Sequence, residues 1–463
     1  MSLLLAALPL LLLMLVAYRG FSVIVAAPIL AMLAVALYDL GAVPATFSGL
    51  FMAKVADFLG LYFPVFLMGA LFGKLIEISG FSSAIVAAVI RAAGPHRSMI
   101  AIVTVAALLT YGGVSVYVVV FAVYPFGAAL FRESGIPKRL LPATIGLGAF
   151  TFTMDALPGT PQIQNIIPTS FFGTTTWAAP GLGLIASLLI FGAGMAYLET
   201  RRKQAGRLGE GYGDMLVNEP EPPAGGRLPP LALAVLPLLV VALANLALTM
   251  LLPRLLGDSQ SVTLPGLAHP IMIDVKKQGA LWAVQGALLL GTLTTVIGGY
   301  RNVAARFNEG VRTAVGGALL AAMNTASEYG FGAVIASLPA FIAVREALSR
   351  ISDPLLNEAV TITSLAGITG SASGGMSIAL AALGQDFARA GDATGIPREV
   401  LHRIASMASG GMDTLPHNGA IITLLAVTGL THRQAYRDIL ALTGIKTATV
   451  FVMIAIYYAT GIV

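Results

Sequence analysis

The sequence contains no cysteine and carries little charge. Of its 463 residues none is Cys, and Asp, Glu, Lys and Arg together make up only 11%. The lack of cysteine excludes thiol redox chemistry, Cys-ligated zinc and iron–sulfur clusters. A soluble domain carries roughly a quarter charged residues, so this chain has too few charges to cover its own surface. The composition therefore indicates a membrane protein.

Motifs of several enzyme classes are missing as well. The sequence has no His-Glu-x-x-His motif, no Gly-x-Ser-x-Gly motif and no nucleotide-binding loop. Its five histidines are spread along the chain and predict no metal site. We expect no enzyme activity, no cofactor and no direct use of ATP. The net charge of +5 comes from basic residues in short loops, which is typical of membrane proteins, so nucleic-acid binding is not expected.

Long apolar runs fill most of the chain, which is 57% hydrophobic with a mean hydropathy of +0.86. A helix needs roughly 20 apolar residues to cross a bilayer, and five runs approach or reach that length: 1–18, 21–38, 181–198, 231–252 and 444–463. The 51 glycines and the lack of alternating strands favour helices over a barrel. We predict an all-α polytopic membrane protein with about ten to fourteen membrane segments, some of them re-entrant.

One hydrophilic segment divides the chain. Residues 199–227 hold five Arg or Lys and a tail rich in Pro and Gly, which disfavours helix. We therefore predict an N-terminal half at 1–198, a linker at 199–229 and a C-terminal half at 230–463. Basic residues next to a membrane segment indicate that the linker is cytoplasmic.

The two halves share short motifs in the same order. Met-Asp-x-Leu-Pro occurs at 154–158 and again at 412–416, and Gly-Ile-Pro occurs at 135–137 and 395–397. "SGFSSAIVAAVI" (79–90) resembles "YGFGAVIASLPA" (329–340), and "YGGVSV" (111–116) resembles "SGGMSI" (373–378). Four collinear matches predict an internal duplication, and duplicated halves are typical of secondary transporters.

Both halves also contain interrupted apolar segments at corresponding places. Residues 107–120 and 363–383 have glycines and hydroxyl residues between two apolar arms, which predicts re-entrant hairpins. Residues 148–168 and 405–425 read as helices that unwind at Asp-x-Leu-Pro. Unpaired backbone at membrane depth is tolerated only inside protein or beside a wet cavity, and helix N-termini attract anions. The breaks therefore predict a site for a small organic anion. Its candidate residues are Gly112, Gly113, Ser115, Asp155, Gln162, Asn165, Gly370, Ser371, Ser373, Gly374, Thr414, His417 and Asn418.

Intramembrane acids are functional candidates by default. We expect Asp413 and His417, four residues apart, to couple proton movement, because His titrates near neutrality. The alternative for Asp155 and Asp413 is a capping role that holds each break together, and for His417 a structural hydrogen bond.

Three further residues have two interpretations each. Glu77 and Glu328 precede the duplicated Gly-Phe and are either a proton relay or markers of a helix end. Tyr111 is either part of the site or a packing residue.

With these motifs laid out, the chain resembles the gluconate:proton symporter family of the ion transporter superfamily. The similar segments are "GALFGKLIEISGF" (69–81), "GSASGGMSIALAAL" (370–383) and "ASMASGGMDTLPHNG" (405–419). The resemblance implies a bacterial inner-membrane symporter of organic acids, with two inverted repeats that each hold a hairpin and a discontinuous helix. It also implies a homo-oligomer with a mobile transport unit, and a site at Gly370, Ser371 and Met412–Pro416.

Two segments depart from the family pattern. The family's His-Pro-Gly-Pro stretch corresponds to Ala156–Pro161, which has no histidine, and its Asn-Asp-Pro-Gly stretch to Met412–Pro416. Leu157, Met412 and Leu415 would suit a shorter, less hydroxylated acid than gluconate, such as one like 3-hydroxybutyrate. We predict carboxylate symport with H+, with Na+ as the alternative ion and an uncoupled anion channel or facilitator as the alternative mechanism.

Overall fold

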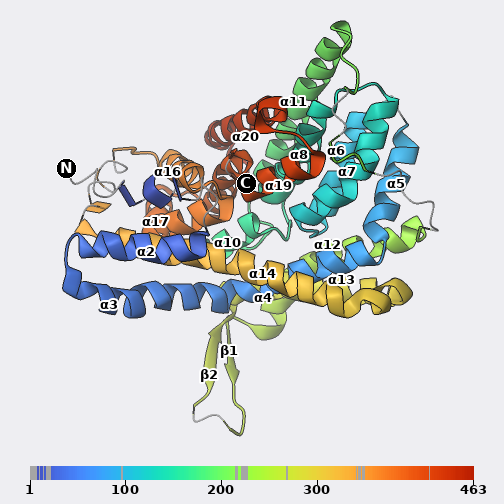
Figure 1. Cartoon of the computed structure of the whole chain (residues 1–463). Helices are drawn as coiled ribbons and strands as arrows, with labels where there is room; N and C mark the ends of the chain where they lie inside the picture. The colour runs from blue at the N-terminus through green and yellow to red at the C-terminus, as the bar shows by residue number, and fades with distance from the viewer. Residues whose placement is uncertain are drawn as a thin grey trace.

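Among the residues that the structure describes, the regular secondary structure is helical apart from one short β-hairpin (Figure 1). The computed structural model describes residues 8–9, 11–13, 15–16, 22–94, 97–213, 217–220, 228–266, 269–339, 341–342, 346, 350–416 and 418–463. It describes the backbone but not the side chains of Lys276 and Lys277.

Six described helices are long and apolar enough to cross a membrane: Leu40–Ile78, Val116–Glu133, Pro180–Arg207, Leu231–Leu256, Gln278–Gly298 and His432–Thr460. Four shorter apolar helices accompany them at Val23–Ala36, Phe81–Ala93, Ser98–Tyr111 and Gly419–Thr428. Large apolar side chains such as Leu188 (70% exposed) and Ile297 (77% exposed) lie on the outer surface, where lipid rather than water is their favourable surrounding. The predicted all-α polytopic fold class is confirmed.

The first half runs from α2 to α11. Its elements are α2 (Val23–Ala36), η1 (Leu40–Ala42), α3 (Val43–Thr46), η2 (Phe47–Phe51), α4 (Met52–Ile78), α5 (Phe81–Ala93), α6 (Ser98–Tyr111), α7 (Val116–Glu133), η4 (Lys138–Leu140), α8 (Leu141–Ala149), α9 (Phe152–Asp155), α10 (Ile163–Phe172) and α11 (Pro180–Arg207). We call α6 and α7 the first hairpin, and residues 156–162 the first break.

The second half runs from α12 to α20. Its elements are α12 (Leu231–Leu256), β1 (Ser259–Val262), β2 (Ile271–Asp274), α13 (Val275–Gly298), α14 (Tyr300–Ser337), α16 (Pro354–Thr369), α17 (Ala372–Thr394), α18 (Arg398–Gly410), η5 (Gly411–Thr414), α19 (Gly419–Thr428) and α20 (His432–Thr460). We call α16 and α17 the second hairpin, and residues 415–418 the second break. Each half thus contains a hairpin, a Gly-Ile-Pro loop, a broken helix and a long helix in that order.

The helices form two groups (Figure 1). α4 and α14 pack along each other, with α2 against α14 and with α13 and its partner α12 beside α4; we call these five helices the α4–α14 layer. The hairpins, the broken helices, α11 and α20 lie on one side of this layer and form the hairpin body. The antiparallel strands β1 and β2 pair Ser259 with Asp274 and project from the opposite side.

A glycine with positive φ turns the chain at each hairpin tip. Gly113 has φ +92° and Gly370 has φ +67°, a backbone region that side chains with a Cβ rarely adopt. After Gly370, Ser371 begins α17 by accepting a hydrogen bond on its Oγ from the Gly374 amide at 3.0 Å. Ser373 and Gly374 therefore lie in the first turn of α17 rather than at the tip itself, where the "SGGMSI" match would place them.

One duplicated motif folds differently in the two halves. Gly80 has φ +80° and separates α4 from α5, whereas its duplicate Gly330 lies inside the uninterrupted α14. α11 continues to Arg207, so the start of the predicted linker is helical, because Glu, Arg, Lys, Gln and Ala favour helix. β1 and β2 have no counterpart among the predicted elements.

Charged groups join the end of α11 to α20 and to the turn before the first broken helix. The Arg139 guanidinium donates to both carboxylate oxygens of Glu210, at 2.6 and 2.8 Å, and holds the pKa of that carboxyl below its usual value. Asp438 of α20 accepts from Arg139 at 3.2 Å and from Arg201 at 2.7 Å. These bonds join α11, α20 and the turn that precedes the first broken helix.

Candidate functional site

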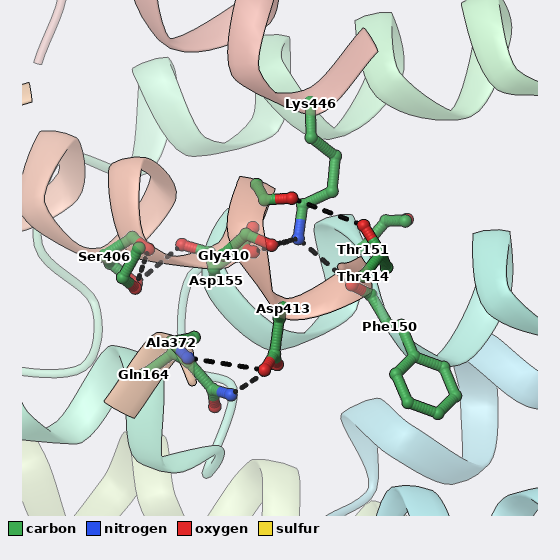
Figure 2. Close-up of polar contacts among 12 residues, drawn as sticks. Phe150, Thr151, Asp155, Gln164, Ala372, Ser406, Gly410, Asp413, Thr414 and Lys446 are labelled. Atoms are coloured by element: carbon green, nitrogen blue, oxygen red, sulfur yellow. Dashed lines mark hydrogen bonds and ion pairs between the residues drawn. The ribbon is translucent and has the colours of Figure 1, made fainter. Parts of the chain in front are cut away.

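Asp413 joins three of the interrupted elements. Its Oδ1 accepts hydrogen bonds from Asn418 Nδ2 at 2.9 Å and from the Ala372 amide at 3.4 Å. Its Oδ2 accepts one from Gln164 Nε2 at 3.1 Å. These donors belong to the start of α19, the start of α17 and the first turn of α10, so the half-buried carboxylate lies where the second hairpin and both breaks meet (Figure 2).

Asn418 strengthens the same junction. Its Oδ1 accepts from the amides of Ala420 and Ile421 at 2.8 and 3.3 Å and thereby caps α19. Its Nδ2 donates to the Gly370 carbonyl at 2.9 Å as well as to Asp413. Asn418, Asp413 and Gly370, all predicted site residues, are therefore in direct contact.

Asp155 forms a buried ion pair with Lys446. Lys446 Nζ of α20 lies 2.6 Å from Asp155 Oδ2, and both side chains are 1% exposed. The same ammonium donates to the carbonyls of Gly410 at 2.6 Å and Phe150 at 3.0 Å. Figure 2 shows Lys446 pointing toward Asp155 and Gly410, with Asp413 beyond them. A methyl group on Gly410 would overlap the Asp155 carboxylate, so this glycine allows the two broken helices to touch.

A second buried cation, Arg403 of α18, holds the first broken helix in place. Its guanidinium donates to the carbonyls of Asp155 (3.0 Å), Ala178 (3.1 and 2.7 Å) and Thr176 (3.5 Å), and to Asn165 Oδ1 (2.9 Å). These bonds supply partners for backbone carbonyls that a broken helix leaves without a helical donor. Asn165 accepts from Arg403 and also contacts His402 Nε2 at 3.2 Å, which places it in this supporting network rather than beside Asp413.

The first hairpin tip is bound to the first break. Gln162 Nε2 donates to the Thr110 carbonyl at 2.7 Å, and the Tyr111 hydroxyl donates to the Pro158 carbonyl at 2.9 Å. The tip glycines pack against apolar side chains: Gly112 against Leu238, and Gly113 against neighbours that include Leu288. Ser115 begins α7 without capping it through its side chain.

The remaining predicted residues have separate positions. Thr414 Oγ1 lies 2.6 Å from Thr443 Oγ1 of α20. Ser373 Oγ lies 3.4 Å from Thr325 Oγ1 of α14. Glu77 pairs with Lys74 at 2.7 Å near the end of α4. His417 lies outside the described residues.

All donors of the two buried cations are used. Lys446 has three N–H groups and three acceptors, and Arg403 has five N–H groups and five bonds. Backbone amides at the helix N-termini are further donors for a solute. α7 and α10 begin at Ser115 and Gln162 without a side-chain cap, so their first-turn amides are available to an anion.

Four residues of this cluster are not among the site residues predicted from the sequence: Gln164, His402, Arg403 and Lys446. Lys446 had a usable signal, because it is a lone charge inside the apolar run 444–463 and such charges are rarely incidental. Arg403 and His402 stand just after the Gly-Ile-Pro loop, where they resemble ordinary basic loop residues. Gln164 is a neutral polar residue like the nearby Gln162 and Asn165. Only the direction of its side chain, toward Asp413, distinguishes it, and the sequence does not show that direction.

Two hairpins and two broken helices that meet at buried charges are an arrangement that membrane transporters use. No protein-family model matches the chain. The chain is 54% identical to the Bacillus subtilis (strain 168) protein described as uncharacterized transporter YxjC, over 472 residues that cover all of both chains. It therefore belongs to the same family of membrane transporters as YxjC, and not to a family of enzymes. A crystal structure of the Alcanivorax borkumensis YdaH transporter aligns with 89% of this chain and 88% of its own, at 15% identity and a TM-score of 0.49.

Proposed function

We propose that this protein is a secondary active transporter that takes up a small organic acid together with H+. The observation that carries the proposal is the junction at Asp413, where hydrogen bonds join the second hairpin tip and both breaks. Discontinuous segments of both halves that meet at one point are the expected place for a substrate and its coupling ion.

Charge balance favours symport with a cation. The described cluster contains two carboxylates, Asp155 and Asp413, and two cations, Lys446 and Arg403, so its formal charges cancel. A carboxylate that entered alone would add an uncompensated negative charge inside the membrane, where ion burial is costly. A proton carried with it removes that charge. Na+ would balance the charge equally well and is the alternative coupling ion.

The available groups suit a short carboxylate. The uncapped first turns of α7 and α10 offer amide donors and the positive end of a helix dipole. The half-buried side chains of Leu157, Met412 and Leu415 lie in or beside the two breaks and add apolar surface. These features support a short hydroxy acid over a fully hydroxylated sugar acid such as gluconate, within a branch of the gluconate:proton symporter family.

Asp413 has a positioning role in this proposal. Three N–H donors on its two oxygens hold α10, α17 and α19 in register. The assignment of Asp413 and His417 as a proton-coupling pair stays a prediction. A bacterial inner-membrane location and a homo-oligomer, in which the hairpin body moves relative to the α4–α14 layer, complete the proposal.

Uptake into proteoliposomes tests the function. A panel of labelled short carboxylates is offered under an imposed pH gradient, with an Na+ gradient and no gradient as separate arms. We expect accumulation with the pH gradient only. An uncoupled channel or facilitator would equilibrate substrate without concentrating it, and accumulation with Na+ alone would replace H+ as the ion.

Asp413→Asn is the matched variant for this assay. The substitution keeps the size of the side chain but replaces one acceptor oxygen by a donor, so at least one of the three N–H groups loses its partner. We expect loss of both accumulation and substrate exchange, with normal insertion and an unchanged elution profile in detergent. Full accumulation by this variant would remove Asp413 from the mechanism.

A further inference from the structure

Glu328 of α14 is a buried carboxyl group without a partner. The residue is 3% exposed and makes no hydrogen bond or ion pair with any described residue. This distinguishes it from Asp155, which has Lys446, and from Asp413, which has three N–H donors. Burying an ionised carboxylate without a partner is far more costly than burying the neutral acid, so the geometry favours the protonated form.

The Glu328 carboxyl points at the first turn of the second hairpin's α17. A methyl group on Gly374 would overlap the carboxylate of Glu328, so the two groups are in contact. One turn earlier in α14, Thr325 Oγ1 lies 3.4 Å from Ser373 Oγ. One turn later, Gly332 packs against the backbone of Ile378. One face of α14 therefore lies along the start of α17, and Glu328 is at the centre of this contact.

Among the described residues, the charged groups on the neighbouring helices are paired or lie away from this contact. α2 contains no titratable residue, and on α17 the first one is Asp386, which lies about 18 Å along the helix from Gly374. α4 carries Lys54 and Asp57, which pair with each other at 3.1 Å, and Tyr62, which donates to the Ile167 carbonyl. No described charge therefore compensates an ionised Glu328.

A cavity of about 270 Å³ lies between the α4–α14 layer and α10. Asp57, Tyr62, Ser170 and Tyr329 are among its lining residues. Tyr329 directly follows Glu328 in α14, but Glu328 itself is not one of the residues that line the cavity.

We propose that Glu328 binds the coupling proton and thereby controls whether the second hairpin stays packed on α14. This inference rests on the proposed proton symport and assigns its proton to a residue. The protonated side chain is neutral and fits the close contact with Gly374, so the tip stays packed on α14 and the site stays closed. Loss of the proton leaves a charge that must be hydrated, which separates the tip from α14 and opens the site. The first turn of α17 presents N–H groups rather than carbonyls, so it adds no backbone oxygen ligand for Na+.

Transport assays with Glu328→Gln test the role of the carboxyl group. Glutamine mimics the neutral acid and keeps the second hairpin packed on α14, so we expect both accumulation under a pH gradient and exchange of internal for external substrate to be lost. Glu328→Asp should retain accumulation at a reduced rate. Glu358→Gln is the matched control. Glu358 of α16 is also fully buried and makes no hydrogen bond with any described residue, but the carboxylate that lies against Gly374 is that of Glu328. Coupling that survives in Glu328→Gln, or is lost in Glu358→Gln instead, would overturn the assignment.

A labelling assay tests the hairpin contact without any substrate. Because the chain has no cysteine, Ser373→Cys provides a single thiol for a membrane-impermeant maleimide. The labelled fraction is measured near pH 6 and near pH 8, and the same thiol in Ser373→Cys/Glu328→Gln corrects for thiol ionisation. We expect the corrected labelling to rise about fivefold or more at the higher pH, the lower end of ordinary coupling factors. Equal pH dependence with and without Glu328 would refute the proposal, even if the wild-type protein transports a carboxylate; failure of all carboxylate uptake would refute the proposed function instead.

Discussion

Two buried residues of opposite charge form an ion pair in the membrane interior. Asp155 and Lys446 lie far apart in the sequence and meet at 2.6 Å with 1% exposure each. Lys446 also bonds the carbonyls of Phe150 and Gly410, where α8 and α18 end, so the pair supports backbone that has lost its helical partners. A buried pair of this kind is costly to break from one side, because the remaining charge is left without compensation.

Removal of one partner of this pair should therefore destabilise the protein more than removal of both. We expect Lys446→Met to lower the free energy of unfolding by about 3–5 kcal/mol, and Asp155→Asn with Lys446→Met to recover a large part of that loss. The measurement is thermal unfolding of the purified protein in detergent, with Asp155→Asn alone completing the cycle. Additive effects of the two single changes would mean that the two side chains do not interact.

At the scale of elements, the hairpins and breaks depend on a few residues that helices tolerate poorly. Glycine at positive φ turns both hairpin tips, and Pro158 and Pro416 follow the aspartates at the two breaks. These signals are local, so the sequence predicted both hairpins and both broken helices near their observed positions. It did not predict that α14 continues past Gly330, because a glycine at normal helical φ gives no sign of its surroundings.

The tip glycines should be more sensitive to substitution than a surface glycine of the same conformation. Gly113 (φ +92°) would place a Cβ 3.2 Å from Leu288 and 3.3 Å from Pro161, whereas Gly395 (φ +73°) has open space around it. Both alanine variants should lose about 1–2 kcal/mol from backbone strain, and Gly113→Ala should lose more through crowding. Unfolding temperatures in detergent compare the two. A smaller effect at Gly113 than at Gly395 would show that the tip relaxes freely.

At the scale of the whole molecule, the α4–α14 layer meets the hairpin body along α14 and α17. Alternating access requires two discrete arrangements of such packed groups. The contact is close and contains few hydrogen bonds, of which Thr325 with Ser373 is one. Small residues on both sides, Gly332 and Gly374, let the helices approach each other closely.

A covalent bond across this contact should stop transport. Thr325→Cys/Ser373→Cys replaces two hydroxyls 3.4 Å apart, and we expect oxidation to abolish substrate exchange and reduction to restore it. The control is Ser98→Cys/Ser134→Cys, whose hydroxyls lie 2.6 Å apart at the ends of the first hairpin, within one moving group. Exchange that persists after complete cross-linking of the Thr325–Ser373 pair would contradict movement at this boundary.

The sequence by itself determined the membrane class, the repeated order of segments and the places where the helices are interrupted, because hydropathy, proline and glycine act over a few neighbouring residues. It also singled out Asp155, Asp413 and Asn418. Only the tertiary structure decided which groups meet: Gln164 with Asp413 across 249 residues, and Lys446 with Asp155. The physical reason is that an ion pair or hydrogen bond between distant segments depends on how whole helices pack, and no local pattern encodes that geometry.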